Sequence, residues 1–167
     1  MSNQISQLLL PEVEAELAIT RRFVAAVPDA NEEFKPHEKS MKLSRLAGHV
    51  AEMPMFTKLT LTSPPMDLAV KGEVPPHSFV DAAGNLEAFN DFAQQLIDAV
   101  KATSDETFAE TWTLVYGDYP IYSGTRYNAY RSMGINHLIN HRAQLGVYLR
   151  LLGIGVPKSY GPSADEQ

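Results

Sequence analysis

The stretch GINHLINHRAQLGVYLRLLGI, residues 134–154, places His137 and His141 four residues apart in a largely apolar run. In a helix, side chains at this spacing lie one above the other on the same face, so both rings can reach one point. Neighbours on that face, such as Leu145 and Tyr148, indicate that it packs against a core. The two histidines are therefore solvated, or hydrogen-bonded to buried backbone or tyrosine groups, or ligands of a metal ion.

A third histidine, His49, falls on the apolar face of another predicted helix, residues 44–60, beside Met53. Three histidines from two facing helices can form a tripod around one cation. Neutral imidazole suits zinc, nickel, copper and iron, and three protein ligands leave one position open for water or substrate. We therefore predict a metal site at His49, His137 and His141, with hydrogen-bonded core histidines as the alternative.

Two further polar residues stand close to these histidines along the chain. Glu52 follows His49 by three residues, and Gln144 follows His141 by three. Both are candidate catalytic residues, Glu52 as an acid or base and Gln144 as a hydrogen-bond partner of a bound ligand. The simpler alternatives are an exposed helix carboxylate for Glu52 and an ordinary polar contact for Gln144.

The remaining histidines, and two arginines near His141, receive no catalytic role. His37 and His77 each follow a proline in a polar connection, so we expect both rings at the surface. We expect Arg142 and Arg150 to pair with surface carboxylates or to extend along apolar surface into solvent.

Several classes of chemistry are excluded by the sequence. The HxxxH spacing of zinc proteases is present, but Leu138 stands where their catalytic glutamate would be. No phosphate-binding loop, GxSxG nucleophile motif or dinucleotide-binding glycine motif occurs. The absence of cysteine excludes disulfides, thiolate-bound zinc and a cysteine nucleophile of the protein's own.

Composition also limits the partners. The net charge of −6 opposes binding to nucleic-acid phosphates. No apolar run approaches the roughly 20 residues that span a bilayer, and the N-terminal region lacks the cationic start of a signal peptide. We expect one soluble, cytoplasmic domain over residues 1–167, without a nucleic-acid or membrane partner.

Hydrophobic periodicity predicts the elements that must position these residues. Apolar residues recur at helical spacing in four stretches, and an alternating pattern with a Gly-Asp turn predicts a strand or hairpin before the last helix. The expected helices cover residues 7–27, 44–60, 81–102 and 125–152, and the hairpin covers 107–123. The pattern predicts an all-α fold, a four-helix bundle.

The helix ends carry sequence signals of their own. We expect the first helix to begin nearer Leu10 than Ser6, because the proline that follows Leu10 suits a first turn. Ser44 is a candidate cap of the second helix, and Gly153 a stop for the last. The connection at residues 61–79 contains two Pro-Pro pairs, and its length is typical of functional or mobile loops.

Two stretches resemble the DinB family, the DinB/YfiT-like metalloenzymes. One is KPHEKSMKLSRLAGHVAEMPMF, residues 35–56, and the other is INHLINHRAQLGVYLRLLGIGVPKSYGPSADE, residues 135–166. The resemblance implies a four-helix bundle with one long crossover connection, in which His49, His137 and His141 hold a divalent metal. It also implies zinc or nickel as the metal and a homodimeric assembly.

The function that the resemblance implies is metal-dependent chemistry on a small-molecule substrate. Some relatives are transferases or isomerases that use a low-molecular-weight thiol such as bacillithiol or mycothiol, which fits a chain with no cysteine. A metal lowers the pKa of a bound thiol or water, so detoxifying S-transfer and metal-activated water chemistry are both open. The alternative is a non-catalytic, metal- or ligand-binding stress-response bundle that acts as a homodimer.

Overall fold

The computed structural model describes residues 2–70 and 78–166. Most of the predicted connection at residues 61–79 is included, but its segment 71–77 lies outside the described residues. His77, which we expected at the surface, therefore also lies outside them. Within the described part of the chain, no helix is long and apolar enough to cross a membrane.

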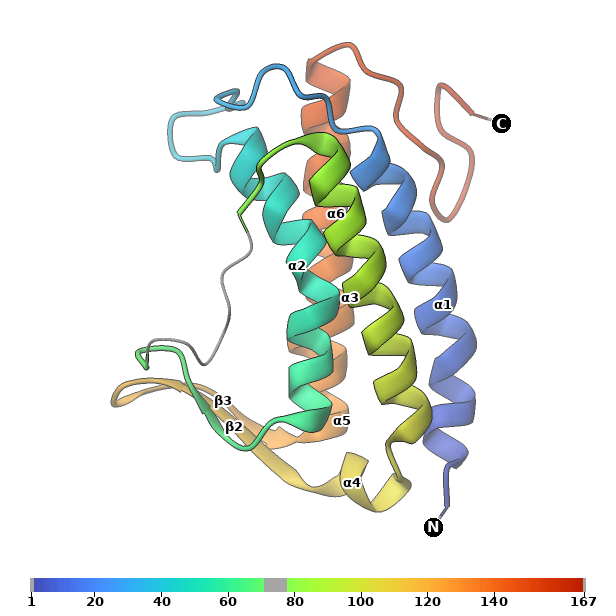
Figure 1. Cartoon of the computed structure of the whole chain (residues 1–167), viewed down its shortest axis with the longest axis vertical. Helices are drawn as coiled ribbons and strands as arrows, with labels where there is room; N and C mark the ends of the chain where they lie inside the picture. Colours follow the sequence, from blue (N-terminus) through green and yellow to red (C-terminus); the bar gives the residue numbers. More distant parts are fainter. Residues whose placement is uncertain (1, 71–77, 167) are drawn as a thin grey trace.

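Four long helical segments run side by side and enclose the main core (Figure 1). Three of them are single helices, and the fourth consists of two α-helices joined by a π-helical turn. The segments are α1 (Gln4–Ala25), α2 (Leu43–Thr62), α3 (Ala82–Ala102), and α5 (Arg126–Ala129) with η1 (Tyr130–Ile135) and α6 (Asn136–Leu151). We call the fourth segment the last helix. A short helix, α4 (Asp105–Ala109), follows α3.

A small sheet corrects the all-α prediction, because the described residues are mostly helical but also form three strands. The strands are β1 (Met66–Asp67), β2 (Thr111–Tyr116) and β3 (Tyr119–Thr125), in the order β1-β2-β3. β2 and β3 form the antiparallel hairpin expected before the last helix, and Gly117 at its turn has a φ of +57°. β1 pairs in parallel with β2, inside a stretch that the sequence indicated only as a loop.

The start of α1 differs from the prediction. The helix begins at Gln4, and Pro11 lies inside it. The Asp105 carboxylate accepts hydrogen bonds from the backbone N–H groups of Gln4 (3.2 Å) and Ile5 (2.9 Å). Because a distant residue satisfies these free N–H groups, the helix can begin before its proline.

The start of α2 differs in a similar way. Lys42, not Ser44, is the capping residue, and no side chain caps the helix. The backbone N–H groups of Leu43 and Ser44 donate to the carbonyls of Phe34 (2.9 Å) and Glu32 (3.1 Å) in the preceding connection. Backbone carbonyls thus take the place of a capping hydroxyl.

The last helix agrees closely with its predicted range. It ends before Gly153, whose φ of +73° is the left-handed conformation that glycine adopts readily. The N–H of Ile154 donates to the carbonyl of Leu149 at 2.9 Å, as in a common helix stop. The predicted glycine stop is confirmed.

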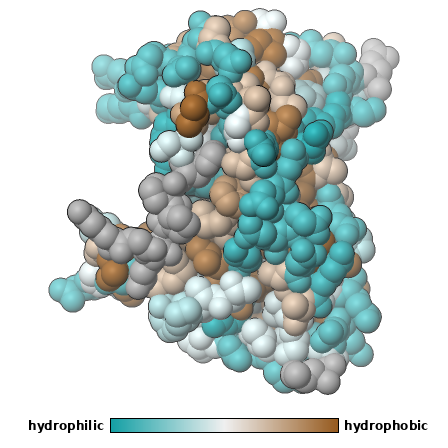
Figure 2. Space-filling view, in the orientation of Figure 1, coloured by the Kyte–Doolittle hydropathy of each residue, from teal (hydrophilic) through white to brown (hydrophobic). Residues whose placement is uncertain are grey.

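Apolar side chains form two clusters that meet around α2 and the sheet. The larger lies between the long helices, and the smaller joins Met66, Trp112, Leu114 and Ala129 beneath the sheet. Phe56 of α2 packs against both clusters. On the face shown in Figure 2, hydrophilic side chains cover α3, while apolar surface lies beside it, between the helices and the hairpin.

Candidate metal site

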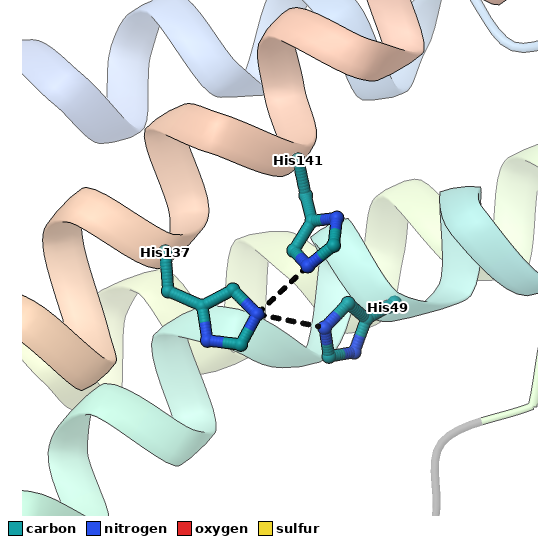
Figure 3. Close-up of side chains that lie close together, drawn as sticks. All are labelled: His49, His137 and His141. Atoms are coloured by element: carbon teal, nitrogen blue, oxygen red, sulfur yellow. Dashed lines mark hydrogen bonds between the residues drawn. The ribbon is translucent and has the colours of Figure 1, made fainter.

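The structure brings the three predicted histidines together. His49 extends from α2, and His137 and His141 extend from the last helix toward it (Figure 3). The Nε2 atom of His137 lies 2.7 Å from Nε2 of His141 and 3.4 Å from Nε2 of His49. One nitrogen from each ring falls within 4.8 Å of the others, so the group could hold a metal ion.

Each ring also has a second hydrogen-bond partner. His49 Nδ1 lies 2.6 Å from Oε1 of Glu52, and His141 Nδ1 lies 2.9 Å from Oε1 of Gln144. The His137 ring hydrogen-bonds the backbone of Met133. Oxygen acceptors of this kind keep a proton on one ring nitrogen and leave the other free to bind a metal. The arrangement therefore directs three Nε2 atoms to a common point.

The site is partly removed from solvent and contains one ion-paired carboxylate. The side chain of Glu52 is 14% exposed, and its Oε1 also accepts from Nη1 of Arg45 at 3.2 Å. Burial opposes ionisation of Glu52, but the hydrogen bond to His49 and the charge of Arg45 outweigh it and lower the pKa of Glu52. Glu52 is thus a partly buried partner of His49 and not the exposed helix carboxylate of the simpler alternative.

Burial keeps two of the rings neutral. It is the main cause of the lowered pKa of His137, and the neighbouring His141 and His49 lower it further. Burial also lowers the pKa of His141, against the opposing effect of its hydrogen bond to Gln144. Metal binding requires neutral imidazole, so this environment favours the ligand form of both side chains.

The π-helical turn η1 lies directly before His137 and brings the last helix close to α2. Gly134 in this turn packs on Thr57 of α2, and a Cβ at Gly134 would lie 2.5 Å from Thr57 Cγ2. Only a residue without a side chain fits this close approach. The π turn and its glycine therefore hold His137 and His141 opposite His49.

The separations of two pairs of ring nitrogens can be compared with those around a bound metal. Two nitrogens each about 2.0–2.1 Å from a tetrahedral zinc lie roughly 3.3 Å apart. The Nε2 atoms of His49 and His137 already have this separation, at 3.4 Å. His137 and His141, at 2.7 Å, have the spacing of a hydrogen bond between rings and would separate by roughly 0.6 Å. The donor set fits a borderline metal such as zinc or nickel.

A cavity of about 200 Å³ adjoins the histidines, and the sequence did not predict it. His49, His137 and Glu52 are the polar residues of its described lining. The remaining lining is apolar and comes from α2, η1, the hairpin and the stretch after β1; it comprises Met53, Met55, Phe56, Leu68, Leu114, Ile121 and Met133. Periodicity placed Met53 and Phe56 on the face of His49, but nothing local indicates that Leu114 and Ile121 reach the same space.

The two arginines after His141 behave differently from each other. Arg142 does not pair at the surface as expected: it is 2% exposed and its Nη1 lies 2.7 Å from Oε2 of the buried Glu16. Arg150 pairs with the surface carboxylate of Asp165, as predicted. The sequence alone could not show which arginine is buried, because Glu16, the partner of Arg142, lies on another helix. His37 is exposed, as expected.

The fold and site define a mostly helical protein in which two facing helices carry a cluster of three histidines. The sequence matches the DinB family over residues 1–167. The chain belongs to the DinB family. No curated protein matches the sequence.

Two solved structures of DinB-like proteins are similar to the chain in fold. A DinB-like protein from Bacillus cereus has a TM-score of 0.68 and 18% identity, and the match covers 91% of this chain and 95% of that one. The DinB-like protein YjoA from Bacillus subtilis has a TM-score of 0.66 and 13% identity, covering 96% of this chain and 99% of that one. At these identities the likeness extends to the fold alone.

Proposed function

We propose that the chain binds one divalent metal ion through His49, His137 and His141. The observation that carries the proposal is that three Nε2 atoms face one another while each ring has a second hydrogen-bond partner. This pattern is typical of metal sites with oriented ligands. Hydrogen bonds between the rings themselves are the alternative, because the Nε2 atoms of His137 and His141 lie 2.7 Å apart.

We further propose that the four long helical segments form a four-helix bundle within a single domain, with the connection from α2 to α3 as its long crossover. In such bundles, metal sites are built from side chains on facing helices. The contacts between α2 and the last helix, and the packing of both into one core, support this interpretation.

Zinc or nickel is the metal that this donor set favours, because three imidazoles with no thiolate suit both ions. A bound metal would lower the pKa of a thiol or water at its open position. Glu52 and Gln144 each contact the Nδ1 atom of a histidine, so we propose positioning roles for them: each orients its ring. The cavity beside His49 and His137 would hold a small-molecule substrate and exclude water.

Two functions remain for a metal-loaded protein. The first is a metal-dependent enzyme, either a thiol-dependent transferase that uses an external low-molecular-weight thiol or an enzyme that activates water. The cavity beside the site favours it, because a purely structural ion needs no adjacent space. The second is a non-catalytic metal- or ligand-binding stress-response protein. The homodimer and the cytoplasmic location stay predictions.

Metal analysis tests the proposed site. Purified protein, stripped with chelator and reloaded with zinc or nickel, should hold close to one equivalent by elemental analysis. His137→Ala and His141→Ala should each abolish stoichiometric binding, whereas His37→Ala, at an exposed histidine, should leave it unchanged. Circular dichroism of each variant separates metal loss from unfolding. Folded wild-type protein that binds neither metal would refute the site.

An assay of conjugation tests catalysis separately. Zinc- and nickel-loaded protein is incubated with glutathione, cysteine or bacillithiol and a model electrophile, and loss of thiol is measured. Turnover above the rate of His141→Ala supports the transferase. No turnover with any thiol, together with stoichiometric metal, would refute the transferase and leave the water-activating enzyme and the non-catalytic alternative.

A further inference from the structure

The cavity beside the histidines has a lining that is unusual for the binding site of a polar molecule. The polar residues of its described lining are His49, His137 and Glu52. The rest of the described lining is made of hydrocarbon and thioether side chains, including the three methionines Met53, Met55 and Met133. Methionine is flexible and polarisable, so it packs well against aromatic rings and irregular apolar groups.

The charges near the cavity disfavour an anionic occupant. Glu52 is the carboxylate of its lining, and no lysine or arginine lies among the described residues that line it. Arg45, which pairs with Glu52, has a side chain that is 54% exposed and does not line the cavity. In the metal-free protein, a carboxylate or phosphate placed there would lose its hydration without gaining a cationic partner among the described lining residues, and that loss is costly.

The size of the cavity limits the occupant further. A dry apolar cavity of about 150 Å³ is known to hold one benzene molecule. This cavity, at about 200 Å³, therefore has room for a single ring with one short substituent, or a branched chain of similar volume. A peptide-like thiol of several residues is too large and too polar to enter it.

We propose that this cavity binds the uncharged, apolar part of a small organic ligand, with any reactive group of the ligand facing His49 and His137. The orientation rests on the proposed metal function, because it assumes chemistry at the histidines. The preference for an apolar ligand does not rest on the metal function, because it follows from the lining alone. The cavity thus assigns a substrate class to the site: small, neutral, mono-substituted aromatic or branched aliphatic molecules.

The methionines provide a direct readout of binding. The chain has six methionines, and protein labelled with ¹³C at the methionine methyl groups would report on each of them by NMR. Toluene is the neutral probe and benzoate its charged counterpart. In chelator-treated protein, toluene should shift the signals of Met53, Met55 and Met133 and leave Met41 unchanged, because Met41 lies outside the lining. Benzoate should bind at least tenfold more weakly.

A pair of variants at Ile121 shows that the cavity is the binding site. Ile121 lines the cavity from β3 and is 37% exposed, so substitutions there leave the core intact. Ile121→Trp should fill the space and weaken toluene binding at least tenfold. Ile121→Val, the matched control, should change affinity by less than threefold.

The outcomes distinguish this proposal from the metal function. Toluene binding to His137→Ala protein that holds no metal would support the apolar site whether or not the metal function holds. Stoichiometric zinc with no methionine shifts, or equal affinity for toluene and benzoate, would overturn the apolar site and leave the metal function standing. Toluene binding that is unaffected by Ile121→Trp would also overturn it.

Discussion

At the scale of residues, the site depends on what each imidazole does with its two nitrogens. His49 and His141 each use Nδ1 to contact a side-chain oxygen three residues later, on the same helix. Spacings of three and four residues place side chains next to each other on a helix, so these pairs are local features of the chain. The free Nε2 atoms then face the gap between the helices.

The contact between His49 and Glu52 leads to a prediction about metal affinity. Glu52→Gln keeps the shape of the side chain but removes the charge that favours a proton on Nδ1 of His49. We expect about 10–100-fold weaker zinc binding, measured by competition with a chromogenic chelator. Glu14→Gln, at an exposed carboxylate on α1, is the matched control and should bind zinc normally. Equal affinities for both variants would mean that Glu52 does not position His49.

The lowered pKa values of His137 and His141 lead to a prediction about pH. Because burial lowers both, these rings stay neutral at a pH where an exposed histidine, of pKa about 6.5, is half protonated. Protons therefore compete with a metal at these two rings only at lower pH. In metal-free protein, NMR titration of the ring signals should show His137 and His141 taking up protons at a lower pH than a free histidine does. Protonation of either ring at or above the pH of a free histidine would contradict this.

At the scale of elements, the close packing of α2 against the last helix determines whether the rings meet. The interface includes the π-helical turn η1, and π turns often occur at functional sites. Gly134 in this turn touches Thr57, which is completely buried and donates a hydrogen bond from Oγ1 to the carbonyl of Met53 at 2.7 Å. The two helices are therefore locked together within one turn of His137.

Gly134→Ala tests this interface. The new methyl group would lie 2.5 Å from Cγ2 and 2.9 Å from Oγ1 of Thr57, so the helices must separate. We expect a loss of about 1–3 kcal/mol in the free energy of unfolding, together with weaker zinc binding. Gly155→Ala, whose Cβ would meet Asp165 only at ordinary contact distance, is the control for urea unfolding.

A double substitution separates the clash from other effects of alanine. Thr57→Ala removes the two nearest atoms, so Gly134→Ala should cost less in a Thr57→Ala background than in the wild type. The same cost in both backgrounds would show that the close approach is not the reason for glycine at this position.

At the scale of the whole molecule, a buried ion pair joins three distant parts of the chain. Arg142 of the last helix contacts Glu16 of α1, and the hydroxyl group of Tyr160 in the C-terminal tail lies between them. Arg142 Nη2 donates to the Tyr160 hydroxyl at 2.7 Å, and that hydroxyl donates to Glu16. These contacts fasten the tail to the helices that it crosses.

Removing the arginine should therefore destabilise the protein strongly. Arg142→Met leaves the Glu16 carboxylate buried without its cationic partner, with the Tyr160 hydroxyl still donating to it, so we expect a loss of about 3–5 kcal/mol in the free energy of unfolding by urea. Arg150→Met, on the same helix, breaks only an exposed pair with Asp165, which solvent screens, so it should destabilise the protein far less. Similar losses for both variants would contradict the distinction.

The features that the sequence determined by itself are those with local causes. Helical periodicity, the glycine stop after the last helix, the hairpin turn and the spacing of His137 and His141 all depend on residues within a few positions of one another. Such patterns can be recognised without the fold, because backbone preference and side-chain direction repeat along the chain. The histidines were predictable candidates for this reason.

Other features were decided only by the tertiary structure, because they join residues far apart in sequence. Asp105 caps α1 from a hundred residues away, so the proline signal near Leu10 did not mark the start of that helix. Arg142 and Arg150 look alike in sequence, yet only one meets a buried carboxylate. The apolar cavity exists because the hairpin folds beside α2. The meeting of His49 with the other two rings likewise required the packing of two helices, which no local pattern specifies.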